Sequence, residues 1–144
     1  MAILSSETLH ATTVSVGGKA VLIEGVSGAG KSDLALRLID RGAALVSDDY
    51  SLVRRLGTSL LASAPATIAG KIEVRGLGII EMPHATEAPV MLVVALGEPA
   101  ARLPEPGRAR QILGIDIPLL AIDGHEPSAP IKVELALSRM SDAV

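Results

Sequence analysis

One stretch decides how this chain folds: Gly25-Val26-Ser27-Gly28-Ala29-Gly30-Lys31-Ser32. It matches the pattern G-x-x-x-x-G-K-[ST] of a loop that binds phosphate. The glycines let the backbone curl so that successive N–H groups point at phosphate oxygens, and the helix that follows adds the positive end of its dipole. In such a loop Lys31 reaches the outer phosphates and the hydroxyl of Ser32 completes the shell of a Mg²⁺ ion.

The motif requires a strand before the loop and a helix after it, and the flanking residues predict both. The pattern of residues 12–24 predicts two strands around a Gly17-Gly18 turn, which form a hairpin. Residues 32–41 carry apolar side chains at helical spacing and stop at Gly42, a residue suited to ending helices; these side chains are Leu34, Ala35, Leu38 and Ile39. The motif and its context therefore agree.

An acidic pair follows the next predicted strand. Residues 43–47 form a short apolar run that predicts a buried strand, and Asp48 and Asp49 come directly after it. In phosphoryl transfer one carboxylate can hold the Mg²⁺ shell while the other accepts a proton from a hydroxyl nucleophile. Taken without the loop, an Asp-Asp pair is as often a solvated turn.

The rest of the chain predicts further strands. We expect strand and turn over residues 50–61, a strand broken by a tight bend over 72–80, and a continuous strand over 90–96. Residues 131–137 alternate well enough for one more strand, although a helix starting near 134 fits equally. No repeat or linker divides the chain, so we expect a single α/β domain over residues 1–144.

Composition excludes several classes of function. The chain has one Tyr and no Phe or Trp, so its core must be aliphatic, and we expect any adenine to be held by aliphatic and backbone groups. A net charge of -3 argues against nucleic-acid binding. With no cysteine there is no disulfide or thiolate zinc site, and we read His84 and His125 as not metal-binding. No apolar run approaches the ~18 residues of a membrane span, so we expect a soluble, cytoplasmic protein.

The loop alone does not name a reaction. A guanine-reading N/T-K-x-D element is absent, because none of the four lysines stands in one, which disfavours a GTP-specific protein; the lysines are Lys19, Lys31, Lys71 and Lys132. Two function classes that use such a loop stay open. One is a nucleotide or small-metabolite kinase, and the other is a nucleotide-binding sensor without turnover.

Four segments together resemble one family, HPr kinase/phosphorylase: residues 25–33, Arg41-Gly42, residues 45–49, and the E-V-R-G-L-G-I-I string at 73–80. The resemblance runs from about residue 10 to about residue 137. It implies a P-loop kinase core akin to phosphoenolpyruvate carboxykinase, with a mixed sheet and flanking helices. It also implies ATP and Mg²⁺ as cofactors and a serine of the phosphocarrier HPr, or of a paralogue, as acceptor, with homo-oligomerisation left open.

The resemblance assigns roles residue by residue. It gives His10 a place at the active site, makes Lys31 the loop lysine and makes Ser32 and Glu73 ligands of Mg²⁺. It makes the Asp48-Asp49 pair the proton acceptor, with Asp49 preferred. It further assigns a signature used in both directions of transfer and a catalytic arginine: Arg75, Gly76, Leu77 and Gly78, and Arg102. We expect Lys31 to face solvent when no nucleotide is bound.

Two departures from the family pattern shape the expectations. The amino-terminal domain usual in the family is missing, since the loop already begins at Gly25, so we expect the short, single-domain form. The P-G-R-N segment that the family uses for dephosphorylation is replaced by residues 124–130, which carry Glu126, Pro127 and Pro130. We therefore expect a kinase with weak phosphorolysis.

Overall fold

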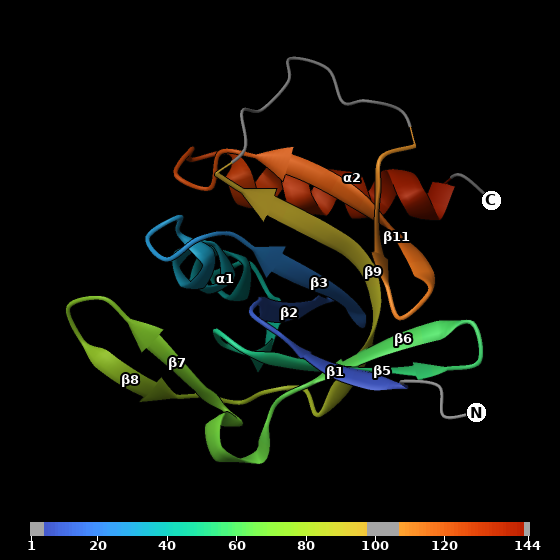
Figure 1. The fold of residues 1–144 in the computed structure, drawn as a ribbon. Coiled ribbons are helices and arrows are strands. Elements are labelled where there is room, and N and C mark those ends of the chain that lie inside the picture. Colours follow the sequence, from blue (N-terminus) through green and yellow to red (C-terminus); the bar gives the residue numbers. More distant parts are fainter. Residues whose placement is uncertain (1–4, 98–106, 143–144) are drawn as a thin grey trace.

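The computed structural model describes residues 5–97 and 107–142, which form a large curled mixed sheet with two helices (Figure 1). Its elements in chain order are β1 (Ser6–Leu9), β2 (Thr12–Val16), β3 (Lys19–Glu24), α1 (Lys31–Asp40), β4 (Ala44–Ser47), β5 (Ser51–Leu56), β6 (Ser59–Ser63), the 3-10 turn η1 (Ala66–Ile68), β7 (Lys71–Val74), β8 (Gly78–Glu81), β9 (Glu87–Leu96), β10 (Ala109–Ile112), β11 (Ile115–Ile122) and α2 (Ala129–Asp142).

The sheet brings the carboxyl ends of four strands to one edge. The strand order along the main path is β1-β5-β6-β9-β3-β2-β4. β11 also pairs with β9, and β10 pairs with β11. β3, β9 and β11 run parallel, and β2 is antiparallel to both β3 and β4, so β4 runs in the same direction as β3. The loops after β3, β4 and β11 therefore start from the same edge, which is where α/β sheets bind ligands.

The predicted hairpin and the predicted first helix are confirmed. β2 and β3 pair around Gly17 and Gly18, whose φ angles of 58° and 85° are those of a two-residue turn that matches strand twist. α1 ends at Asp40 with Arg41 as its C-cap, and Gly42 follows with φ 108°. Gly42 thus supplies the left-handed residue that ends the helix.

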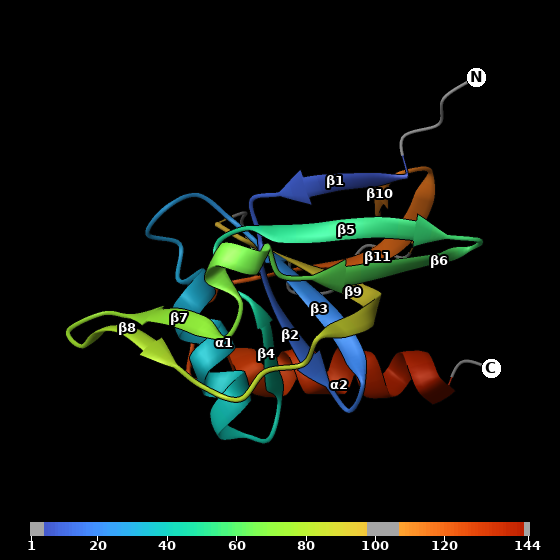
Figure 2. The same cartoon turned by 90° about the horizontal axis from the view of Figure 1, so that it is seen from below.

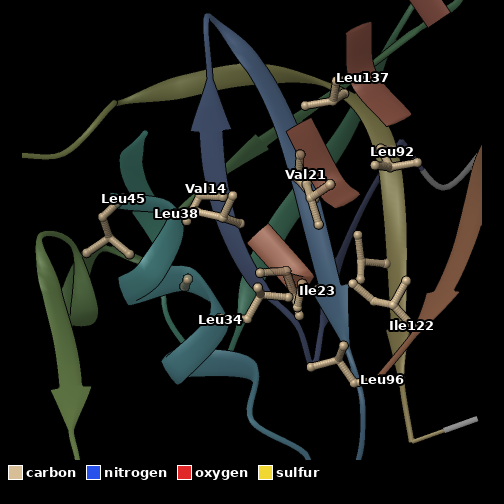
Figure 3. Packing of buried hydrophobic residues seen from close by; sticks show 14 of the residues in the cluster. Val14, Val21, Ile23, Leu34, Leu38, Leu45, Leu92, Leu96, Ile122 and Leu137 are labelled. Carbon is tan, nitrogen blue, oxygen red and sulfur yellow. The ribbon is translucent and has the colours of Figure 1, made fainter. Parts of the chain in front are cut away.

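Both helices pack on one face of the central strands. Leu34 and Leu38 of α1 lie against Val14, Val21 and Ile23, as Figure 3 shows. α2 adds its own buried side chains to the same cluster, namely Ala129, Val133 and Leu137. Burying this aliphatic face fixes α1, and so the loop before it, against β3.

The opposite face is covered by the sheet itself. β1, β5 and β6 curl over the central strands, and Figure 2 shows them on the side away from α2. A second buried cluster fills the space between; it comprises Ala11, Ala20, Leu22, Val46, Val53, Leu60, Ala62, Ala88, Val90, Val93, Ile112 and Ile117. Every one of these is aliphatic, as the composition predicts.

β7 and β8 form a separate hairpin, which we call the arm (residues 71–81). The sequence predicts one bent strand here, and the structure instead has two antiparallel strands joined through Gly76 and Gly78, both with φ near 90°. The arm reaches out beyond α1 in both views (Figures 1 and 2). Leu77 and Ile79 on it are 74% and 69% exposed. Only Ile72, at its base, is fully buried.

The carboxyl end is helical: the helix left open as the alternative is confirmed, although it begins earlier, at Ala129, and the strand over 131–137 is wrong. Ala129, Val133 and Leu137 are spaced by four residues and are all buried, a helical period that the shorter alternating stretch conceals. β10 and β11 have no counterpart among the predicted elements. Among residues 5–97 and 107–142, neither helix is long and apolar enough to cross a membrane.

Candidate active site

A cleft of about 470 Å³ opens at the sheet edge where β3 and β4 end. It joins the predicted phosphate loop to the acidic pair, the arm and the segment after β11. The lining residues are Ser27, Gly28, Gly30, Lys31, Ser32, Asp33, Leu36, Asp48, Asp49, Glu73, Val74, Arg75 and His125. Most of the residues singled out from the sequence thus lie around one cavity, although they come from three separate segments.

The glycines of the loop are needed for its shape. Gly28 and Gly30 have φ of 87° and 96°, a backbone region that other residues rarely adopt. A Cβ on Gly25 would lie 3.1 Å from the Cβ of Leu96 and 3.0 Å from that of Ala29. Gly30 is also the N-cap of α1, so the helix begins directly under the loop.

Lys31 folds back onto its own loop. Its Nζ donates hydrogen bonds to the carbonyl oxygens of Gly25 at 2.7 Å and Val26 at 3.4 Å, and the residue is only 8% exposed. The expectation that Lys31 faces solvent is therefore wrong. The physical reason is that an ammonium near buried strands needs acceptors, and the carbonyls of the loop supply them.

Asp48 is buried, and both of its carboxylate oxygens accept hydrogen bonds. Oδ1 accepts from the hydroxyls of Ser32 at 2.6 Å and Thr12 at 3.1 Å, and Oδ2 accepts from the backbone N–H of Glu73 at 3.0 Å. The side chain links β2, α1 and the base of the arm. A carboxylate with three donors is held in one position, next to the loop hydroxyl.

Asp49 is exposed and lines the cleft. Its Oδ1 lies 2.8 Å from Nε2 of His10, and the His10 ring stacks on Tyr50 with ring centroids 5.0 Å apart. The backbone N–H of Asp49 donates to Oγ1 of Thr12 at 3.0 Å, and its φ is 67°. The two neighbouring carboxylates therefore have different surroundings: that of Asp48 accepts from Ser32, Thr12 and Glu73, and that of Asp49 lies beside His10.

The signature residues lie on the arm. Glu73 and Arg75 line the cleft, and the backbone bond from Glu73 to Asp48 ties the arm to the acidic pair. Gly76 and Leu77 lie in the turn, where Leu77 is exposed, and Gly78 begins β8. Arg102, the assigned catalytic arginine, lies outside the described residues.

Sequence reasoning missed three residues that shape the site. The hydroxyl of Thr12 donates to Oδ1 of Asp48 and accepts from the backbone N–H of Asp49. The sequence indicates only that Thr12 begins a predicted strand. His125 follows β11 and lies against Gly30, because a Cβ there would be 3.2 Å from its Cε1. Arg37 of α1 donates to the carbonyl oxygens of Gly124 and Glu126 and so holds that segment. None of the three has a sequence signal, since their partners are distant along the chain.

The oxygen donors suit Mg²⁺. The described residues contain no cluster of three or more acidic or histidine side chains poised to hold a metal alone. Mg²⁺ in phosphoryl-transfer sites is held by one or two carboxylates together with substrate phosphates, so such a cluster is not needed. Ser32 and Asp48, 2.6 Å apart beside the loop, and the carboxylate of Glu73 on the cleft wall fit this pattern.

Glu73→Gln should raise the Mg²⁺ concentration needed for half-maximal transfer severalfold, because a negative charge is lost from the cleft wall. The measurement is a Mg²⁺ titration of initial rates at saturating ATP. Glu81→Gln is the matched control, since Glu81 is exposed on the same arm but does not line the cleft. An unchanged Mg²⁺ dependence in Glu73→Gln would remove this residue from the metal site.

Comparisons with known proteins agree on one family. The model of the HPr Serine kinase C-terminal domain matches residues 2–125. A protein named HPr kinase/phosphorylase from Caldicellulosiruptor bescii is 37% identical over 128 residues, which cover 80% of this chain and 41% of that relative. One of the same name from Clostridium tetani is 48% identical over 81 residues, 56% of this chain and 27% of the relative. The chain thus spans less than half of the length of either relative.

A solved structure has the same fold. The HPr(Ser) kinase/phosphatase from Coxiella burnetii superposes with a TM-score of 0.80 at 29% sequence identity. The match covers 94% of this chain and 96% of that one. Both the sheet and the helices that position the cleft are therefore shared with that protein.

Proposed function

The chain belongs to the family of the HPr serine kinase C-terminal domain, which confirms the resemblance of its motifs, and we propose that it transfers the γ-phosphoryl group of ATP to a serine hydroxyl of an HPr-like phosphocarrier. The chain's mixed α/β fold is that of the family's C-terminal domain. HPr as the acceptor is carried over from the names of relatives that are longer than this chain.

One observation carries the proposal: two adjacent carboxylates beside a phosphate loop have opposite surroundings. Asp48 is buried and saturated by three donors, whereas Asp49 is exposed with His10 at 2.8 Å. A pure nucleotide binder has use for the first kind of carboxylate but not for the second. A kinase for a hydroxyl acceptor needs both, one at the metal and one as base.

Each residue of the cleft has a separate role in the proposed reaction. The backbone N–H groups of residues 25–31 hold the phosphates, and Lys31 exchanges its loop carbonyls for phosphate oxygens. Ser32, Asp48 and Glu73 would hold Mg²⁺, which neutralises phosphate charge when bound. Asp49 accepts the proton of the incoming seryl hydroxyl, and His10 keeps its carboxylate oriented through the Nε2 hydrogen bond. Catalysis is then mostly positioning and charge neutralisation.

A transfer assay tests the proposal. Purified protein, Mg²⁺ and γ-labelled ATP are incubated with an HPr-type carrier, with the same carrier bearing Ala in place of its acceptor serine, and without any carrier. Label is expected on the intact carrier alone. Transfer to a free small acceptor without protein would instead favour a metabolite kinase, and ATP binding without any transfer would favour a nucleotide-binding sensor.

Phosphorolysis is expected to be much slower than forward transfer at millimolar phosphate. The reverse reaction must hold inorganic phosphate next to a phosphoserine, so it depends on extra donors around that inorganic phosphate, beside the phosphate loop. The segment that follows β11 supplies few: Pro127 and Pro130 lack an N–H, and the carboxylate of Glu126 pairs with Lys132. The measurement is pyrophosphate release from phosphoserine carrier, Mg²⁺ and phosphate. A rate equal to the forward rate would show that other residues supply these donors.

A further inference from the structure

We propose that His125 is the platform on which the nucleoside of ATP rests, and that it makes the site tolerant of the base that it receives. The inference rests on the proposed function, because it assumes that the loop at residues 25–32 holds a nucleoside triphosphate. It replaces the expectation that aliphatic and backbone groups alone hold the base. His125 is exposed and lines the cleft, whereas the chain's single Tyr stacks on His10 beside Asp49.

Sheet topology places His125 on the nucleoside side of the loop. The strand order is β4-β2-β3-β9-β11, so the acidic pair after β4 and His125 after β11 flank the loop from opposite sides. Ser32, Asp48 and Asp49 mark where Mg²⁺, the terminal phosphate and the acceptor meet. A triphosphate whose terminal end points to β4 directs its nucleoside toward β11.

The segment that carries His125 is held firmly against the phosphate loop. Two close approaches join them: a Cβ on Gly124 would lie 3.2 Å from the carbonyl oxygen of Ala29, and a Cβ on Gly30 would lie 3.2 Å from Cε1 of His125. Arg37 donates to the carbonyl oxygens of Gly124 and Glu126, the latter at 2.9 Å. The backbone N–H of His125 donates to Asp123 at 2.9 Å.

This rigidity matters for binding. A ring that is already held beside the loop loses little conformational freedom when a ligand arrives, so stacking on it contributes to affinity. An aromatic face accepts any base, because every base has a π face. We therefore expect ATP and GTP to depend on His125 to the same degree, and a ligand without a base not to depend on it.

The experiment compares ligands with and without a nucleoside. Dissociation constants of Mg-ATP, Mg-GTP and Mg-tripolyphosphate are measured by calorimetry for wild type, His125→Ala, His125→Phe and His84→Ala. His125→Ala should weaken ATP and GTP about fivefold to tenfold and leave tripolyphosphate unchanged, and His125→Phe should retain nucleotide affinity. His84 is exposed and does not line the cleft, so His84→Ala is the matched control.

The outcomes separate this inference from the proposed function. Equal nucleotide affinity in wild type and His125→Ala would overturn the inference alone. Tripolyphosphate weakened as much as ATP in His125→Ala, with no rescue by His125→Phe, would make His125 a phosphate ligand and also overturn it. A wild-type protein that binds none of the three ligands would overturn the proposed function itself. Unchanged melting temperatures of the variants would show that the losses do not arise from unfolding.

Discussion

Lys31→Ala is expected to reduce phosphoryl transfer to the carrier by about 10³-fold or more. The ammonium is the one cation inside the loop segment, and its charge is needed most when the transferring phosphoryl carries its greatest negative charge. The variant should also lose a few degrees of melting temperature, because the hydrogen bonds from Nζ to Gly25 and Val26 disappear. Initial rates with labelled ATP and a thermal unfolding scan measure the two effects separately.

Lys19→Ala is the matched control for this substitution. Lys19 begins β3, at the end of the strand remote from the loop that follows Glu24. Its removal should leave transfer within about twofold of wild type. Near wild-type transfer by Lys31→Ala in a folded protein would remove the phosphate-loop assignment, and with it the proposed reaction.

Asp49→Asn is expected to bind ATP normally and to lose transfer by about 10²-fold or more, the usual effect of removing a general base. The amide oxygen can still accept the hydrogen bond from His10, so the geometry of the site is kept while the proton acceptor is lost. Asp49 is exposed, so the substitution should leave the melting temperature unchanged. ATP affinity by calorimetry and single-turnover transfer rates distinguish the two effects.

Asp48→Asn should have a different effect from Asp49→Asn, because Asp48 is buried and hydrogen-bonded. An amide at this buried position replaces one carboxylate oxygen with a donor, which then faces either the backbone N–H of Glu73 or the hydroxyls of Ser32 and Thr12. We expect a lower melting temperature and a higher requirement for Mg²⁺. If Asp48→Asn were stable and bound ATP but did not transfer, while Asp49→Asn transferred at the normal rate, Asp48 would be the base and the assigned roles of the two carboxylates would be reversed.

Sequence alone predicted the parts of the site whose partners are neighbours along the chain. The loop at residues 25–32, the hairpin around Gly17-Gly18 and the helix that ends before Gly42 all depend on turn glycines, capping and apolar spacing within about twenty residues. The four segments at 25–33, 41–42, 45–49 and 73–80 together predicted the family that the family model then matched. These features are local, so residue order alone specifies them.

Tertiary structure decided which side chains face one another and which are buried. His10 and Asp49 are 39 positions apart, and Ser32 and Asp48 are 16 apart; each pair meets only because β2, β3 and β4 are adjacent in the sheet. Strand direction likewise brings the segment after β11 to the loop after β3 and places His125 at Gly30. The different surroundings of Asp48 and Asp49 have the same origin, because the donors of Thr12 and Glu73 reach the carboxylate of Asp48 and leave that of Asp49 exposed. The family resemblance preferred Asp49 as the base, but residue type and order alone do not distinguish two adjacent aspartates.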